Sequence, residues 1–211
     1  MRHWPVTGLE LTTAELVLRL PTDAELDALA QVAADGVVPD DAVYFPQPWA
    51  SAPSAERARS VVQNHWWARG DWTRENWRLL LAVFRDGQVI GQQNLSARDF
   101  ATTGEARTGF WLGRRFQGQG YGTQMRAAAL ALAFDGLGAA RVTSTAFADN
   151  AASRAVSRKF GYRPNGIHRI AVDGRPYDAH EEVVERADWR GHARVAPVEI
   201  AGLSDCLPLF H

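Results

Sequence analysis

The sequence predicts a single α+β domain in which helices pack a mixed β-sheet. The chain has 211 residues, 46% of them hydrophobic, and is long enough to bury a substantial core. Short runs rich in β-branched and aromatic residues alternate with longer segments that begin at helix-capping residues. Because no internal repeat, low-complexity tract or linker interrupts this alternation, one domain accounts for it.

The first predicted strand covers residues 16–20 and ends at Pro21, which lacks the N–H that a sheet ladder needs. Thr22 or Asp23 then caps a helix that we expect to run to about Ala34, because either side chain can accept a hydrogen bond from the first helical turn. The chain therefore begins with a strand followed directly by a helix.

A proline-rich loop over residues 35–53 separates this helix from a second one, predicted from Ser54 to about Arg69. Residues 79–84 and 89–91 are apolar and flank Asp86–Gly87, a dipeptide that favours a two-residue hairpin turn. We therefore expect a β-hairpin after the second helix.

The second half of the chain is predicted to alternate strands and helices before a final strand pair. The expected elements are a strand near residues 107–112, a helix over 120–136, a strand over 141–148, a helix over 150–160, and strands near 167–172 and 178–185. Together with the hairpin they complete the mixed sheet.

The most informative segment runs from Gly109 to Thr123, where an apolar strand leads through a glycine-rich turn into an alanine-rich helix. The first four N–H groups of a helix have no partner inside it, and the helix dipole is positive there, so phosphates bind at such sites. Gly118, Gly120 and Gly122 have no Cβ to hold a ligand away from the backbone and tolerate positive φ. This segment predicts a site for a large phosphate-bearing ligand.

Common catalytic and nucleotide-binding motifs are excluded. A P-loop needs a lysine after its last glycine, and the only lysine of the chain is Lys159. A dinucleotide fingerprint needs a glycine five residues after Gly118, where Thr123 stands. The serine hydrolase elbow Gly-x-Ser-x-Gly does not occur. The remaining pattern is Gln-x-x-Gly-x-Gly at Gln117, Gly120 and Gly122.

A second motif follows about thirty residues later. A β-branched strand is followed by Asn150, a natural N-cap, with Ser153 three residues further and Gly161–Tyr162 at the end of the helix. Taken alone, these residues indicate helix capping. In this order and spacing, however, the two motifs resemble those of the GNAT superfamily of acyl-CoA N-acyltransferases.

The resemblance implies a GNAT fold, with α/β/α layers around a mixed, mostly antiparallel sheet whose fourth strand carries a bulge and splays from the fifth. It implies acyl-CoA as co-substrate, with its pyrophosphate on the glycine turn and its pantetheine arm against the Asn150 amide. The backbone N–H groups of the fourth strand would bind the thioester carbonyl and the pantetheine. The implied cofactor-binding residues are Trp111, Leu112, Arg114, Gln117, Gly118, Gln119, Gly120, Tyr121, Gly122, Thr123, Asn150 and Ser153.

The resemblance also implies how the reaction proceeds. An amine attacks the thioester, the N–H of Leu112 is the candidate oxyanion donor, and Ser153 is the candidate donor of a proton to the departing thiolate. Many relatives carry a tyrosine where this chain has Ser157, and a glutamate base where it has Val172. Three residues could replace that base by position only: Glu105, His168 and Asp178.

Within the superfamily the chain resembles the RimJ/RimL-like branch, whose members acylate protein N-termini and small amines. It is closest to an actinobacterial group that shares the opening Arg2–Pro5, the Phe45-x-x-Pro48-Trp49 segment and the terminal Pro208–Phe210. Succinyl-CoA use is described in that group, so the donor is acetyl-CoA or succinyl-CoA, with succinyl-CoA expected to react better. The predicted acyl pocket consists of Phe45 and Trp49 above Gln92, Gln93 and Asn94, whose amides could meet a carboxylate.

Composition limits the remaining function classes. A net charge of −1 without a basic stripe gives no indication of binding to nucleic acid or to an anionic membrane surface, so we expect neither partner. The single cysteine, Cys206, suits a reducing cytoplasm, and no signal peptide or membrane span is visible. The six histidines lack ligand spacing, so we expect no metal. The expected acceptor is an amine, namely a protein N-terminus, a lysine or a small molecule.

We expect residues 1–211 to form one acyltransferase domain with a C-terminal extension at about 193–211. The extension alternates from Val195 to Ile200 and then becomes apolar, so it could add a strand across a subunit boundary and make a homo-oligomer. Two other function classes stay open from the sequence. They are a catalytically silent CoA-binding regulator and an interaction protein that acts through this extension.

Overall fold

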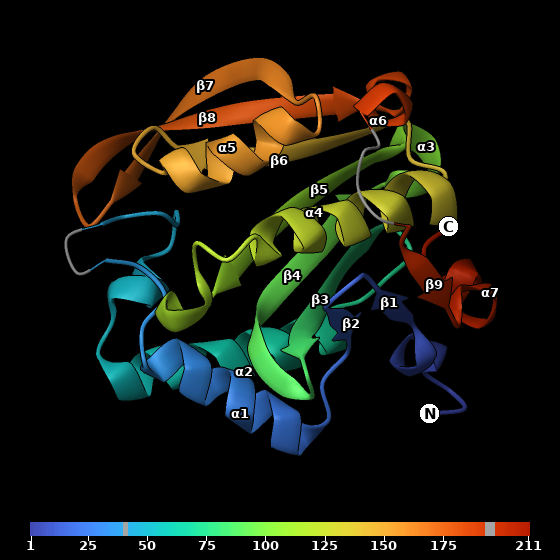
Figure 1. Cartoon of the computed structure of the whole chain (residues 1–211), viewed down its shortest axis with the longest axis horizontal. Coiled ribbons are helices and arrows are strands. Elements are labelled where there is room, and N and C mark those ends of the chain that lie inside the picture. The colour runs from blue at the N-terminus through green and yellow to red at the C-terminus, as the bar shows by residue number, and fades with distance from the viewer. Residues whose placement is uncertain (40–41, 193–196) are drawn as a thin grey trace.

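One mixed sheet runs through the molecule, and helices cover both of its faces (Figure 1). The structure is a computed structural model and describes residues 1–39, 42–192 and 197–211. Within these residues the strand order is β7-β8-β6-β5-β4-β3-β2-β1-β9. The strands are β1 (Glu10–Thr12), β2 (Val17–Arg19), β3 (Asn76–Arg85), β4 (Gln88–Arg98), β5 (Glu105–Leu112), β6 (Arg141–Phe147), β7 (Arg163–Val172), β8 (Arg175–Glu185) and β9 (Glu199–Ala201).

Every neighbouring pair of strands is antiparallel except β5 and β6, which are parallel. The α-helices are α1 (Asp23–Ala34), α2 (Ser54–Gly70), α3 (Phe100–Thr103), α4 (Tyr121–Ala131), α5 (Ala151–Lys159), α6 (Arg186–His192) and α7 (Leu203–Cys206). Short 3-10 helices are η1 (Pro5–Gly8), η2 (Pro48–Ser51), η3 (Arg114–Phe116) and η5 (Leu207–Leu209), and a π-helical turn, η4 (Leu132–Gly136), extends α4. The predicted helix over 120–136 is therefore α4 plus η4.

Alternation along the strands divides the interior into two cores. In β3 the side chains of Leu81 and Val83 pack with α4, whereas those of Ala82 and Phe84 pack with α1 and α2. The layers are thus α1 and α2, the sheet, then α4 with α5 (Figure 1). The predicted α/β/α layering is confirmed.

The start of α1 forms as its residues predict. Thr22 Oγ1 accepts from the N–H of Glu25, and the Glu25 carboxylate accepts from the N–H of Thr22, a complete capping box. Arg19 of β2 donates to Glu25 at 2.6 Å. This bond holds the pKa of Glu25 down at about 2, so the link between β2 and α1 stays charged at neutral pH.

The predicted hairpin is β3 and β4. Its turn places both Asp86 (φ 49°) and Gly87 (φ 77°) in the left-handed region, as a type I′ turn requires. The register shifts just after the turn, because Val83 pairs with Gly91 while Phe84 pairs with Val89. Ile90 is therefore an extra residue in β4, and this bulge sets which face each later residue of β4 occupies.

The C-terminal segment completes the same sheet. Strand β9 pairs antiparallel with β1, with Ile200 opposite Leu11. The sequence did not predict β1, which offers this extension an edge within the chain. Because β9 is itself the last strand of the sheet, pairing across a subunit boundary stays a prediction. Residues 193–196, including Val195 and Ala196, lie outside the described residues.

The last residues fill a pocket of aromatic rings. The ring of Phe210 is fully buried and lies 4.9 Å from Trp77 and 5.3 Å from Trp72, centroid to centroid, in edge-on geometry. The indole N–H of Trp72 also donates to the carbonyl of Leu209 at 3.0 Å. The chain end thus packs as core.

We predict that Phe210→Ala lowers the free energy of unfolding by about 3–5 kcal/mol, because it removes a buried ring and leaves a cavity. Ile167→Ala is the control, since Ile167 is largely exposed and its truncation should cost under about 0.5 kcal/mol. Urea unfolding of both variants measures this. Similar small losses in the two variants would mean that the C-terminal segment does not pack as described.

Candidate active site

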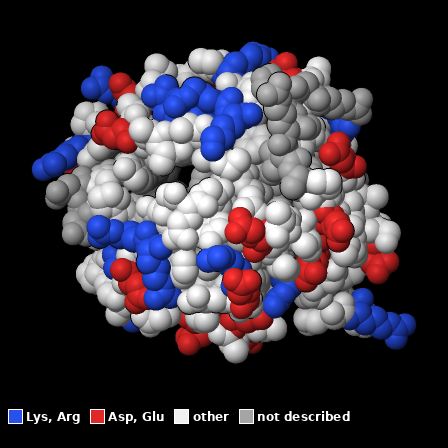
Figure 2. Space-filling view, viewed as in Figure 1, with Lys and Arg blue, Asp and Glu red and all other residues white. Residues whose placement is uncertain are grey.

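A cavity of about 690 Å³ opens where two strands of the sheet separate. β5 and β6 pair from Glu105 with Arg141 up to Thr108 with Ser144, and the pairing ends there although both strands continue. Residues from both sides of the sheet line the cavity, including Trp111 on one side and Ser153 on the other. Figure 2 shows a hollow on this face of the molecule with Lys and Arg side chains on both sides of it.

The separation leaves backbone donors on β5 without a strand partner. The N–H of Gly113 donates to the carbonyl of Ile90 at 3.0 Å, and residues along an antiparallel pair alternate between facing toward and away from the partner strand. The N–H groups of Leu112 and Phe110 therefore point away from β4 and toward the gap left by β6. The N–H of Trp111 points toward β4, so the prediction that it also faces the ligand is wrong.

The splayed strand pair is confirmed, but the bulge that the resemblance implied in this strand is not. The register between β4 and β5 is unbroken from Gly91–Leu112 to Ser96–Arg107. The gap arises on the other side of β5, where β6 diverges, so no extra residue is needed to free the N–H groups.

The glycine turn forms an anion-binding helix start. Gly120 is the N-cap of α4 with φ 87°, Gly118 has φ 74°, and no side chain caps the helix. The N–H groups of Thr123 and Gln124 donate to the carbonyl of Gly120. The N–H groups of Tyr121 and Gly122 therefore have no acceptor within the helix. A Cβ on Gly122 would lie 3.1 Å from the Phe110 ring, a tight contact, so the close approach of α4 to β5 favours glycine.

A lysine stands beside this helix start. Lys159, at the end of α5, donates from Nζ to Thr123 Oγ1 at 3.1 Å. A cation and a helix N-terminus therefore lie together, and both favour a phosphate.

Several predicted cofactor-binding residues hold the turn together. Gln117 donates from Nε2 to the carbonyls of Val37 at 2.7 Å and Leu112 at 2.9 Å, which joins the loop after α1 to the end of β5. Gln119 donates to the carbonyl of Arg115, and the ring of Tyr121 is buried in the core. Their side chains shape the cradle, and the ligand would meet its backbone.

Arg114 is placed differently from the prediction. Its N–H donates to the carbonyl of Gly36 at 3.0 Å. The backbone donor expected to face the ligand is therefore already bonded to the loop after α1.

Asn150 and Ser153 lie together at the start of α5, as predicted. Asn150 Oδ1 accepts from the N–H of Ser153 at 3.1 Å, which is an N-cap bond, and both residues line the cavity. Ser157, one turn later, is buried instead. Of the two hydroxyls, only that of Ser153 can reach a ligand.

The loop that carries Phe45 and Trp49 lines the cavity on the α2 side of the sheet. The rings of Phe45 and Trp49 lie 5.1 Å apart, and Trp49 lies 5.7 Å from Trp111, centroid to centroid. All three residues line the cavity, which agrees with the pocket role predicted for Phe45 and Trp49. Trp111 contributes its side chain to this wall.

The three consecutive polar residues of β4 divide between the faces of the sheet. Gln92 pairs with Trp111 and Asn94 with Gly109, and both line the cavity. Gln93 lies on the α4 face, fully buried, with Nε2 donating to the carbonyls of Asn94 and Gly109, both at 2.9 Å. The prediction that Gln93 lines the pocket is wrong, because strand alternation turns it to the other side.

A buried histidine orients Gln92. His65 Nε2 lies 2.9 Å from Gln92 Oε1, so the ring donates and the Gln92 amide NH₂ stays available to the cavity that it lines. Burial lowers the pKa of His65 to about 4, an effect that the bond to Gln92 partly opposes. The imidazole is therefore neutral at physiological pH and acts by positioning.

Arg126, which is not among the predicted site residues, is fully buried on α4 and lines the cavity. It donates from Nη2 to Ser144 Oγ at 3.1 Å and lies over the rings of Phe110 (5.3 Å) and Tyr162 (5.1 Å). Among the described residues its Nε and Nη1 have no hydrogen-bond partner. The available signal was one charge in an otherwise apolar helical run from Met125 to Phe134.

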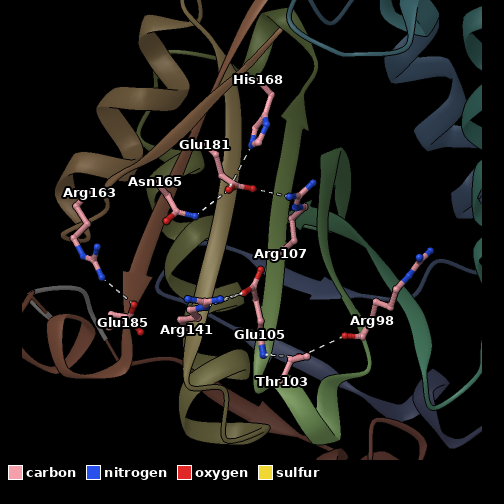
Figure 3. Close-up of polar contacts among 10 residues, drawn as sticks. All are labelled: Arg98, Thr103, Glu105, Arg107, Arg141, Arg163, Asn165, His168, Glu181 and Glu185. Carbon is pink, nitrogen blue, oxygen red and sulfur yellow. Dashed lines mark hydrogen bonds and ion pairs between the residues drawn. The ribbon is translucent and has the colours of Figure 1, made fainter. Parts of the chain in front are cut away.

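The three substitute bases lie outside the cavity wall. Glu105 bonds Arg141 at 2.6 Å, and His168 faces Glu181 at 3.8 Å (Figure 3). Asp178 is exposed, and Val172 packs in a small apolar cluster. Across the part of the chain that the structure describes, no Asp or Glu lines the cavity.

Two further features bear on function class. Residues 1–39, 42–192 and 197–211 contain no group of three or more His, Cys, Asp and Glu side chains suited to a metal ion. In the same residues, no helix has the length and apolar character that a membrane crossing requires.

Residues 15–163 match the family described as Acetyltransferase (GNAT) domain. A GCN5-related N-acetyltransferase from Brucella melitensis is similar in structure, with a TM-score of 0.67 and 23% identity over 86% of this chain and 80% of that chain. An acetyl transferase from Salmonella typhimurium that modifies the N-terminal serine of ribosomal protein L7/L12 gives 0.62 and 20%, over 82% and 96%. RimL in complex with coenzyme A gives 0.62 and 20%, over 82% and 95%.

We predict that the stability of the protein falls as pH drops from about 6.5 toward 4. The unfolded chain protonates His65 near 6.5 and the folded chain only near 4, so acid favours unfolding by up to about 3 kcal/mol. Glu25 has a lowered pKa in the folded protein, so its contribution to stability is lost only when the pH falls below 4.5, the ordinary pKa of a glutamate.

Urea unfolding between pH 5 and 7 measures this effect. His65→Gln should flatten the profile, whereas His3→Gln, at an exposed position, should leave it unchanged. An equally steep profile in His65→Gln would contradict the buried neutral imidazole.

Proposed function

The chain belongs to the GNAT acetyltransferase family, and on that premise we propose that it transfers an acyl group from acyl-CoA to a primary amine by direct attack in a ternary complex. One observation carries the proposal. The backbone N–H groups of Phe110 and Leu112 face the gap left by β6, and the cavity at this gap is lined by Asn150 and Ser153 at the start of α5. The other end of α5 lies at the glycine turn, where Lys159 donates to Thr123. Donors for a carbonyl and a site for phosphates thus lie at the two ends of α5.

The residues present fit coenzyme A. The free N–H groups at the start of α4, with Lys159 beside them, would bind the pyrophosphate. The Asn150 side chain, already fixed by its cap bond, would meet the pantetheine arm, and the thioester would reach the gap between β5 and β6. This assignment uses the backbone of Gly120, Tyr121 and Gly122.

The reaction needs few catalytic side chains in this arrangement. The amine nitrogen forms a bond to the thioester carbon, and the N–H of Leu112 bonds the oxyanion that develops. When the carbon–sulfur bond breaks, the hydroxyl of Ser153 donates a proton to the thiolate and regains one from water. Holding the two reactants together supplies most of the remaining acceleration.

The cavity helps the amine lose its own proton. No described acid lines it, while the guanidinium group of Arg126, which lies over the Phe110 ring, does. Nearby positive charge disfavours an ammonium ion, so a bound amine releases its proton to water more readily than in solution. A glutamate at the position of Val172 is then not required.

Arg126 supports a donor whose acyl chain ends in a carboxylate. A buried guanidinium with two unsatisfied nitrogens is costly unless an anion meets it. Arg126 bonds Ser144, the last residue of β6 that pairs with β5, so it lies where the gap closes. Succinyl-CoA would place its carboxylate there, whereas an acetyl group would leave the guanidinium unpaired.

We predict that Gly120→Val abolishes CoA binding, because a branched side chain opposes φ 87° and occupies the phosphate site. Gly87→Val is the matched control, since it strains a turn at φ 77° outside the cradle and should keep CoA affinity. Calorimetry with CoA compares the two folded variants. Unchanged affinity in Gly120→Val would remove the cradle assignment.

We predict that succinyl-CoA reacts with higher kcat/KM than acetyl-CoA, and that Arg126→Met lowers the succinyl value by about 10- to 150-fold, the equivalent of one charged hydrogen-bonding partner of about 1.5–3 kcal/mol. The acetyl value should change little. Arg85→Met is the control, since Arg85 also lies over a ring, that of Tyr121, but outside the cavity wall.

The release of CoA thiol, followed with the same amine acceptor, measures kcat/KM for both acyl donors. Equal or higher kcat/KM with acetyl-CoA in the wild type would favour an acetyl donor. A succinyl preference that survives in Arg126→Met would contradict the role assigned to Arg126. CoA binding without thiol release from any donor would favour the silent regulator.

A further inference from the structure

The half of the cavity beneath α2 is basic and polar. Of the lining residues that the structure describes, three are arginines, Arg78, Arg107 and Arg126, and none is acidic. Arg126 lies on the α4 side of the sheet, whereas Arg78 and Arg107 lie on the α2 side. The side where an acceptor would enter thus has cations of its own.

Arg78 and Arg107 stand in one row across three strands. Arg78 of β3 pairs with Ser96 of β4, and Ser96 pairs with Arg107 of β5, so the three side chains share a face. Paired residues on neighbouring strands are close enough to bind one small group together. This row is the floor of the cavity on the α2 side.

Arg78 has only neutral partners. It donates from Nη1 to Asn64 Oδ1 at 3.1 Å, and its Cζ lies 4.4 Å from the centre of the Trp67 ring. Its Nη2 is buried and has no hydrogen-bond partner among the described residues. The indole holds the guanidinium in place without neutralising it, so its charge is available to a ligand.

Arg107, in contrast, is fixed by an acid. It donates from Nη2 to Glu181 Oε1 at 2.7 Å, and Glu181 Oε2 accepts from Asn165 Nδ2 at 2.9 Å with His168 beyond it at 3.8 Å (Figure 3). Glu181 lies on β8 and reaches Arg107 across β6 (Figure 3). Arg107 is therefore held rigidly beside Ser96, and Arg78 carries the uncompensated charge of the row.

The row is remote from the reacting atoms. Arg107 precedes Phe110 and Leu112 by three and five residues along β5, which at about 3.3 Å per residue is roughly 10–17 Å of strand. An anion bound at Arg78 is therefore several bonds from an amine at the thioester.

We propose that the acceptor is an anionic amine whose carboxylate lies several bonds from the reacting nitrogen. Arg78 binds this carboxylate together with Ser96 and Arg107. The inference rests on the N-acyltransferase function proposed above. A peptide with Asp or Glu close behind its N-terminal residue has this chemistry, as does, more compactly, a free acidic amino acid. Polycationic amines are excluded, because they would bring further positive charge to a cavity without acids.

The test compares acceptors that differ only in charge. With a saturating acyl donor, CoA release is followed with three peptides that carry Asp, Asn or Lys at the second and third positions, and with free glutamate. We expect kcat/KM for the Asp peptide to exceed that for the Asn peptide by 10-fold or more and that for the Lys peptide by 100-fold or more. A higher value for free glutamate than for the Asp peptide would assign the site to small molecules.

Variants connect the preference to the row. Arg78→Gln should reduce the Asp-over-Asn ratio to within about 3-fold, and Arg78→Lys should restore part of it. Arg2→Gln is the charge-matched control, since Arg2 is exposed ahead of η1 and outside this cavity, and its loss should leave the ratio unchanged.

Two results would overturn the inference and are separable from failure of the proposed function. Equal kcat/KM for the three peptides in the wild type contradicts an anionic acceptor while N-acyl transfer stands. An Asp preference that survives in Arg78→Gln contradicts the assigned site. No CoA release with any amine or donor contradicts the proposed function itself.

Discussion

The end of the β5–β6 pairing after Thr108 and Ser144 is the constraint on which the rest of the site depends. A parallel pair that continued would bond the N–H groups of Phe110 and Leu112 and close the cavity. Unpaired backbone donors are costly where water is excluded, so these two groups remain available to a carbonyl. The Phe110 ring, between Gly122 and Arg126, fills the gap on the α4 side.

The gap also explains the distribution of charge. The start of α4 and Lys159 supply positive potential beyond the end of β5, Arg126 supplies it where β5 and β6 diverge, and Arg78 supplies it on the α2 side of the cavity. A buried arginine without an acid destabilises a fold, so the burial of Arg126 beside this cavity favours an anionic ligand over a structural role. An acyl-CoA would bind at the α4 end of this positive potential, and an acidic amine would bind at the Arg78 end.

Features set by short-range chemistry could be predicted from the sequence. The capping box at Thr22, the turn at Asp86–Gly87 and the left-handed Gly120 each follow from neighbouring residues. Gln93 could not be placed, because three consecutive polar residues carry no alternation, and the bulge at Ile90 sets the face. The bond between Arg114 and Gly36, and the pairing of β9 with β1, join residues far apart in sequence.

The most direct measurement of the central claim is amide hydrogen exchange along β5, followed by NMR with and without acyl-CoA and in the absence of an amine. We expect the N–H groups of Phe110 and Leu112 to exchange rapidly in the free protein and to slow down when acyl-CoA binds. The N–H of Trp111, which points toward β4, should be protected in both states. Protection of Phe110 and Leu112 in the free protein, or no change at saturating acyl-CoA, would contradict the central claim.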